Sequence, residues 1–263
     1  MTAAAYINEL LTYEEYAFSL EELLGKSSKT KTSLARELSR LVGKGEIINL
    51  RKGFYLILPH RYRPMGQLPI ELYANKLFRY LNKDYYLALY SAARFHGAAH
   101  QQPQMDYVIT RLPPLLDINK RGMRIRFFTT ANWPVKSIVQ KKSDAGYFNV
   151  SSPALTAADL VHHQTKSGGL NRVLAILEEL SEEIGEQDMG NLLSWYPHKS
   201  ALQRLGYLLD HIQPGLPLAE QLFDHVKAGP FYPVLLGLKK GMKAGATGNR
   251  WKVDVNINLE SDL

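Results

Sequence analysis

Residues 18–58 constrain the fold of this chain most, because capping and helical patterns follow one another there within a short distance. Ser19 and Glu22 have the spacing of a capping box, which predicts a helix that begins after Ser19. A second helix is predicted over residues 32–42, where apolar residues repeat at the period of one helical face. These apolar residues are Leu34, Leu38 and Leu41. With a further helix expected within residues 6–16, the pattern indicates a helix-turn-helix.

A β-hairpin is predicted directly after these helices. Two runs with β-strand character, residues 46–50 and 54–58, flank a short turn that contains glycine. The turn itself, residues 51–53, also carries an arginine and a lysine. A helix-turn-helix followed by such a hairpin is typical of a winged helix, a domain in which one helix can enter the major groove of DNA.

Positive charge is concentrated in the same part of the chain. Residues 26–63 contain ten Lys or Arg and two Glu, a net charge of +8, whereas the whole chain carries +7. DNA is therefore the first partner to consider. The expected phosphate contacts are Lys29, Lys31, Arg51 and Lys52, and the expected base contacts are Thr32, Ser33, Arg36 and Arg40. The alternatives are a winged helix that binds protein, or a basic helix face that is only solvated.

Length and composition set the remaining bounds. A chain of 263 residues favours two domains, which we place at residues 1–65 and 66–263. The absence of cysteine excludes disulfides, cysteine-ligated metals and thiol nucleophiles. The first 25 residues contain no Lys or Arg, unlike a secretory or transit peptide, and no apolar run has the length of a membrane helix. We therefore expect a soluble cytoplasmic protein.

The second domain is predicted to be mixed, which makes the chain α+β: a winged helix-turn-helix followed by a domain with a small sheet and a helical C-terminal half. Two helices are expected before the sheet, one beginning near Pro69 and one over residues 87–95. The expected strands are residues 107–110, 123–128, 135–139, 147–150 and 251–257. The expected later helices begin at Ser152-Pro153 or cover residues 170–184, 188–195, 199–212 and 216–226.

A second basic segment lies in the predicted sheet. Residues 107–142 hold eight Lys or Arg against one Asp, a net charge of +7, so that everything outside the two basic segments carries −8. If Ile125 and Phe127 face a core, their neighbours lie on the opposite side of the strand. The residues of this possible second basic surface are Arg111, Arg121, Arg124 and Arg126. It could contact DNA, RNA or an acidic protein, or be a solvated sheet face.

Few residues suggest catalysis or metal binding. His96 and His100 have the spacing of metal ligands on a helix, but Gly97 lies between them and no carboxylate accompanies them. Asp159 and His163 are four residues apart on a predicted helix, a spacing that more often gives a surface hydrogen bond than a ligand set. We therefore predict no catalytic residue, no metal site and no cofactor.

Four segments, found in order over most of the chain, carry a resemblance to a known family. They are the wing residues 51–55 and the segments 85–98, 155–161 and 203–209. Together they resemble the AbiEi antitoxins of type IV toxin–antitoxin systems. None of the four is a sharp catalytic motif, and the resemblance gives no catalytic residue to this sequence.

The resemblance implies two tasks and no enzyme activity. The winged helix would repress transcription of its own toxin–antitoxin operon. The C-terminal domain would neutralise a nucleotidyltransferase-like toxin, with or without a stable complex. Two alternatives remain open at this point: a winged-helix regulator whose C-terminal domain senses a ligand, and an enzyme in which Asp159 and His163 would be the first residues to test.

Overall fold

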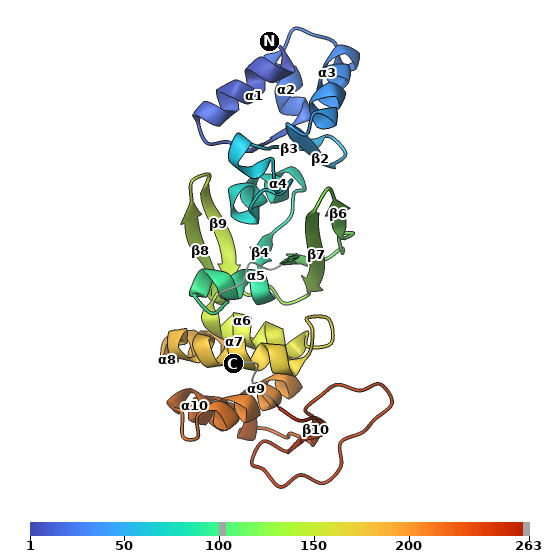
Figure 1. Cartoon of the computed structure of the whole chain (residues 1–263). Helices are drawn as coiled ribbons and strands as arrows, with labels where there is room; N and C mark the ends of the chain where they lie inside the picture. The colour runs from blue at the N-terminus through green and yellow to red at the C-terminus, as the bar shows by residue number, and fades with distance from the viewer. Residues whose placement is uncertain (100–103, 260–263) are drawn as a thin grey trace. The chain divides into compact units, whose positions relative to one another are not determined.

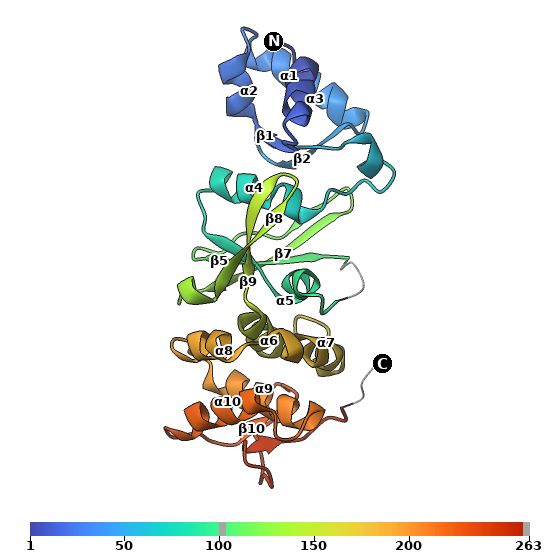
Figure 2. The ribbon, with the colours of Figure 1, turned by 90° about the vertical axis from the view of Figure 1, so that its left-hand side faces the viewer.

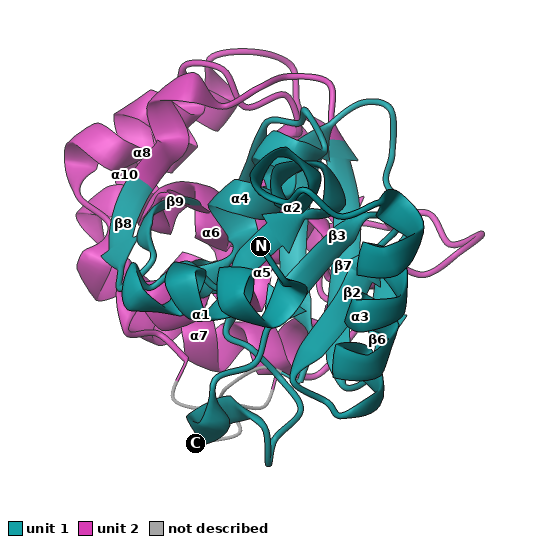
Figure 3. Ribbon diagram, turned by 90° about the horizontal axis from the view of Figure 1, so that it is seen from above, with its two compact units in different colours: residues 1–86, 104–129, 140–149 teal, residues 87–103, 130–139, 150–263 magenta. Residues whose placement is uncertain are grey.

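The computed structural model describes residues 1–99 and 104–259, and its helices and strands form an α+β fold (Figure 1). The chain divides into two compact units (Figure 3). Unit 1 contains residues 1–86, 104–129 and 140–149, and unit 2 contains residues 87–103, 130–139 and 150–263. This division does not test whether residues 1–65 fold alone, so the domain boundary at residue 65 stays a prediction.

The N-terminal part of unit 1 has the order helix, strand, helix, helix, hairpin. Its elements are α1 (Ala3–Thr12), β1 (Ala17–Ser19), α2 (Leu20–Lys26), α3 (Lys31–Gly43), β2 (Ile47–Arg51) and β3 (Phe54–Ile57). The three strands form an antiparallel sheet of order β1-β3-β2. Ser19 and Glu22 form the predicted capping box at the start of α2. The predicted helices and hairpin of this segment are thus confirmed, and their order is that of a winged helix.

One hydrophobic core holds these elements together. Its members come from all three helices and from the small sheet: Ala3, Tyr6, Ile7, Leu10, Phe18, Leu23, Leu34, Leu38, Ile47 and Ile57. Phe18 lies in β1 with 0% of its surface exposed, and its ring stacks on Tyr55 of β3 at 5.4 Å. Burial of so many apolar side chains is the main force that orients α3 on its own domain.

A six-stranded sheet follows, with the order β6-β7-β5-β4-β9-β8. The bounds are β4 (Tyr85–Leu87), β5 (Asp106–Arg111), β6 (Ile118–Lys120), β7 (Met123–Thr130), β8 (Ile138–Ser143) and β9 (Gly146–Ser151). Strands β6 and β7 pair antiparallel, and β4 pairs parallel with β9. Before the sheet come the 3-10 helices η1 (His60–Tyr62) and η2 (Ile70–Leu72), and then α4 (Ala74–Tyr80).

Unit 2 is mostly helical. Its elements include α5 (Leu89–Ala93), η3 (Arg94–His96), α6 (Pro153–His162), α7 (Leu170–Glu183), α8 (Glu186–Leu193), α9 (Lys199–Ile212) and α10 (Pro217–Lys227). Helices α6, α7 and α8 form one layer, and α9 and α10 form the next (Figures 1 and 2). The helices predicted after residue 152 are confirmed. In residues 1–99 and 104–259, no helix is both long and apolar enough to span a membrane.

Three sequence predictions of regular structure need correction. The helix expected over residues 87–95 is split, because Leu87 completes β4 and Ala88 is extended, with φ −134° and ψ 174°. Residues 135–137 form the 3-10 helix η4 after Pro134, so β8 begins only at residue 138. The expected strand 251–257 is reduced to β11 (Val253–Asp254), which pairs with β10 (Val234–Leu235).

The late start of β11, at Val253 instead of Trp251, has a clear physical cause. Lys252 has a φ of 53°, which interrupts the extended chain, and the side chain of Trp251 is 1% exposed. The indole of Trp251 donates a hydrogen bond to the Asp210 carboxylate at 2.6 Å. A Cβ atom on Gly206 would lie 2.1 Å from this ring, so the ring packs directly on the backbone of α9. Trp251 therefore anchors the segment to a helix instead of continuing a strand.

Candidate nucleic-acid interface

Helix α3 presents two different faces. Its N-cap is Thr30, whose hydroxyl accepts a hydrogen bond from the backbone N–H of Ser33 at 3.3 Å. Leu34 and Leu38 are 0% and 1% exposed and lie in the core. The predicted contact residues on the other face are exposed, except that Ser33 is half-buried: Lys31, Thr32, Ser33, Arg36 and Arg40. The helix thus has the docked side and the polar, basic side that a recognition helix requires.

Lys29 is engaged by a carboxylate of α3. Its ammonium forms an ion pair with Glu37, and Glu37 also accepts a hydrogen bond from the backbone N–H of Ala3 at 2.9 Å. The hydrogen bond from Lys29, followed by that from Ala3, lowers the pKa of the Glu37 carboxyl. Glu37 therefore connects α3 to the start of α1, and much of the charge of Lys29 is already neutralised.

The wing tip differs from the sequence expectation. The Arg51 guanidinium donates a hydrogen bond to the Leu116 carbonyl and lies 5.5 Å from the centre of the Phe127 ring. Its Nε is buried and has no hydrogen-bond partner among the described residues, and burial lowers the pKa of Arg51. Only Lys52 keeps an exposed side chain there, while its carbonyl accepts a hydrogen bond from Tyr80 at 2.9 Å. Arg51 is thus a packing residue in this structure, so it leaves the set of expected phosphate contacts.

The four arginines of the expected second basic surface have different surroundings. Arg111 pairs with Asp84 at 2.8 Å, and Arg126 lies 3.7 Å from Asp117. Arg124 is exposed on β7 beside Ile125, which is 1% exposed. The expected alternation holds at these two residues but ends at Phe127, which is half-buried.

The hairpin β6–β7 brings two basic side chains to α3 and β2, which like the hairpin belong to unit 1. Arg121 donates a hydrogen bond to the carbonyl of Val42 in the last turn of α3, at 2.5 Å. Lys120 donates to the carbonyl of Asn49 in β2 at 3.3 Å. A cation at a helix C-terminus is favourable because it meets the negative end of the helix dipole. The sequence placed both residues in a basic segment but gave no sign of these contacts, which join positions more than 70 residues apart.

Both residues considered for catalysis lie in unit 2, where Asp159 is buried and His163 is half-buried. Asp159 is 5% exposed and lies 3.5 Å from the Tyr196 hydroxyl, so the expectation of a surface carboxylate is wrong. The rings of His162 and His198 stack at 3.9 Å, and His163 lies at 4.6 Å from His162. Burial is the main cause that lowers the pKa of His162 to about 4 and that of His163 to about 3. Both imidazoles are therefore neutral at neutral pH.

The structure gives no support to a metal site in the part of the chain that it describes. Within residues 1–99 and 104–259, no three His, Asp or Glu side chains are grouped so that they could hold a metal ion. His96 lies 2.7 Å from the Ser151 carbonyl through its Nε2. His100, its expected companion, lies outside the described residues.

Comparison with known proteins identifies a matching family and solved structures that resemble this fold. Residues 86–211 match the AbiEi antitoxin C-terminal domain. The crystal structure of the RV2827C protein from Mycobacterium tuberculosis superposes with a TM-score of 0.65 at 17% identity, over 95% of this chain and 90% of that one. An antigenic nucleotidyltransferase-like protein from Paracoccidioides brasiliensis gives a TM-score of only 0.38 at 10% identity, over 57% and 88% of the two chains. No curated protein gave a significant match.

Proposed function

Because residues 86–211 match the AbiEi antitoxin C-terminal domain, we propose that the chain is a cytoplasmic antitoxin of this family that also represses its own operon. The family supports the role of an antitoxin in a toxin–antitoxin system. The proposal adds that the toxin is nucleotidyltransferase-like, and that the protein acts by binding and not by catalysis. A stable complex with the toxin is not part of the proposal.

The observation that carries the DNA-binding part is the outer face of α3. The proposed base contacts are Thr32, Ser33, Arg36 and Arg40, and the proposed phosphate contacts are Lys31 and Lys52. All of these side chains lie on α3 except Lys52, which lies at the wing, and all are exposed except Ser33. The buried leucines of α3 fix the orientation of this helix. Arginine on an exposed helix face can donate two hydrogen bonds to one guanine, which gives sequence preference.

The two tasks can be separated by changing the full-length protein at α3 alone. We expect Arg36→Ala/Arg40→Ala to lose repression of a reporter placed behind the chain's own upstream DNA. The same variant should still rescue growth when the toxin is co-expressed, because the substitutions are exposed and lie outside residues 86–211. A matched control is Arg172→Ala, an arginine of the antitoxin domain that stacks on Tyr90 and should leave repression unchanged. Loss of rescue in a folded Arg36→Ala/Arg40→Ala protein would contradict this division of tasks.

A further inference from the structure

A shallow hollow of about 350 Å³ lies in unit 1 where α4 turns into β4 and where β5 ends. It is lined by Phe78 and Arg79 of α4, by residues 82–84 of the connecting turn, and by Arg111 and Leu112 at the end of β5. The α4–β4 segment and the end of β5 are separated by about thirty residues in the sequence, so no local sequence motif indicates the site.

Cations predominate in this hollow. Arg79, Lys83 and Arg111 line it together with a single carboxylate, that of Asp84. Arg79 is exposed and has no ion-pair partner among the described residues. The local net charge is +2, from three cations and one carboxylate, which would attract an anion into the hollow.

Two of the three cations are held in place by the protein. The Lys83 ammonium donates to the carbonyls of Arg111 and Pro113 at 3.4 and 3.1 Å. Arg111 uses its Nε toward Asp84 at 2.8 Å. An ammonium has three donors, so Lys83 keeps one for a ligand after its two contacts, while Arg111 contributes its positive charge at the same place. Holding them in advance lowers the entropic cost of binding.

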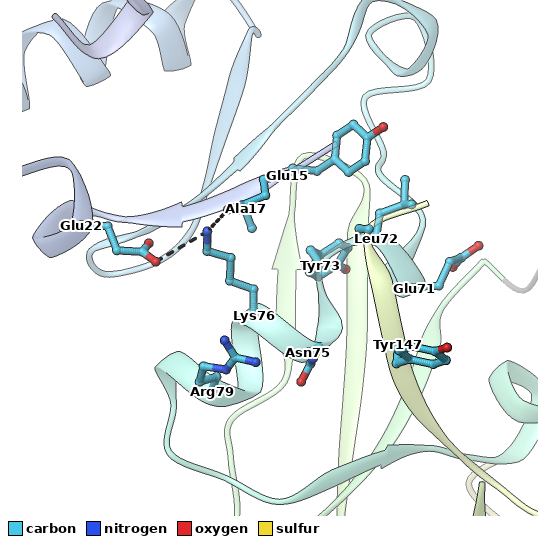
Figure 4. Close-up of a pocket in the computed structure, with 12 residues that line it drawn as sticks. Glu15, Ala17, Glu22, Glu71, Leu72, Tyr73, Asn75, Lys76, Arg79 and Tyr147 are labelled. Carbon is cyan, nitrogen blue, oxygen red and sulfur yellow. Dashed lines mark hydrogen bonds and ion pairs between the residues drawn. The ribbon is translucent and has the colours of Figure 1, made fainter. Parts of the chain in front are cut away.

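A second hollow in unit 1, of about 340 Å³, provides a useful contrast (Figure 4). Its central cation, Lys76, lies between two carboxylates, 2.5 Å from Glu15 and 3.5 Å from Glu22. Glu71 adds a third carboxylate to the lining, so cations do not predominate there although Arg79 lines this hollow as well. The excess of positive charge is therefore a property of the first hollow.

We propose that the hollow around Arg79, Lys83 and Arg111 binds the phosphate groups of a nucleotide-sized ligand. Guanidinium groups match phosphate oxygens with paired hydrogen bonds, and a lysine adds a compact charge. The volume lies at the lower end of the range for small-molecule sites. Leu112, with 58% of its surface exposed, offers an apolar wall for the base or the sugar. The site goes beyond the proposed function, because neither repression nor toxin rescue requires it.

The test is titration calorimetry of the full-length protein with ATP, GTP and inorganic phosphate. We expect at least one nucleotide to bind with a dissociation constant of about 1 mM or tighter, and Arg79→Ala/Arg111→Ala to weaken it at least about tenfold. The matched control is Arg61→Ala, since Arg61 is also an exposed arginine that faces an aspartate, at 3.6 Å from Asp144. The affinity of the Arg61→Ala variant for the nucleotide should equal that of the wild type.

Three results would overturn the proposal. One is no heat with any nucleotide or with phosphate, and another is equal affinity of the double variant and the wild type. The third is that the two arginines are needed to bind a random DNA duplex while no free nucleotide binds. The phosphate recognised would then be that of a nucleic acid. If the double variant does not fold, Arg79→Glu serves instead, because this exposed side chain has no ion-pair partner among the described residues whose loss would unfold the protein.

Discussion

Arg36 and Arg51 are both arginines of the proposed winged helix, but the structure gives them opposite surroundings. Arg36 is exposed on the outer face of α3. Arg51 is packed at the wing tip, with its guanidinium on the Leu116 carbonyl and near the Phe127 ring. Replacing each by alanine should therefore separate DNA recognition from stability within one domain.

The magnitudes follow from these contacts. Arg36→Ala removes an exposed side chain, so the free energy of unfolding should change by no more than about 0.5 kcal/mol. Operator binding should weaken by about 1–3 kcal/mol, which is roughly 5- to 150-fold in dissociation constant. Arg51→Ala removes a charged hydrogen bond of about 1.5–3 kcal/mol. Because burying the guanidinium also carries a desolvation cost, a net loss of stability of about 1–2 kcal/mol is expected.

Two assays on each variant distinguish a loss of DNA recognition from a loss of stability. Urea denaturation gives the free energy of unfolding, and fluorescence anisotropy with the operator gives affinity under conditions in which both variants are folded. We expect Arg51→Ala to bind within about threefold of the wild type, a change of less than about 1 kcal/mol. An Arg51→Ala protein that keeps its stability and loses specific binding as strongly as Arg36→Ala would refute the roles assigned to the two arginines.

Three further predictions concern the wing, a helix contact and pH. Lys52→Ala should weaken specific and random DNA alike and reduce the salt dependence of binding by about one unit of slope; an unchanged slope would remove Lys52 from the phosphate contacts. Gly206→Ala should destabilise by about 1–3 kcal/mol in urea, because the new Cβ meets the Trp251 ring, whereas Gly190→Ala, whose Cβ meets only a flexible glutamine at 3.4 Å, should not. Equal effects would contradict the packing argument. Burial lowers the pKa of His162 to about 4 and that of His163 to about 3, so the unfolded chain binds protons first and stability should fall as pH drops from about 6.5 toward 4. His162→Gln/His163→Gln should flatten this dependence in thermal melts between about pH 7.5 and 5, and an unaltered slope would assign it to other groups.

The N-terminal helices and the hairpin could be predicted because their signals are local. The Ser19 capping box and the leucine repeat of α3 need only a few neighbouring residues to act, and both are present in the structure. The polar face of α3 follows from the same leucine repeat, so the exposed residues of this helix could also be predicted from the sequence.

The parts that the sequence did not predict depend on distant contacts or on single backbone angles. Arg51 donates a hydrogen bond to the Leu116 carbonyl, 65 residues away in the sequence, and no local sequence pattern predicts this contact. The positive φ of Lys252 keeps residues 251–252 out of the strand that the pattern predicted, so that β11 begins only at Val253. Asp159 has the spacing of a surface pair, yet helix packing buries it, since α7, α8 and α9 all pack against α6.

The most direct test of the account is binding of the full-length protein to its own upstream DNA, measured by fluorescence anisotropy against random DNA of equal length at two salt concentrations. A repressor of this operon should prefer the upstream DNA by about a thousandfold or more, with affinity falling steeply as salt rises. Equal, weak binding to both duplexes would show that the basic face of α3 is only general electrostatics, and would contradict the proposed repressor.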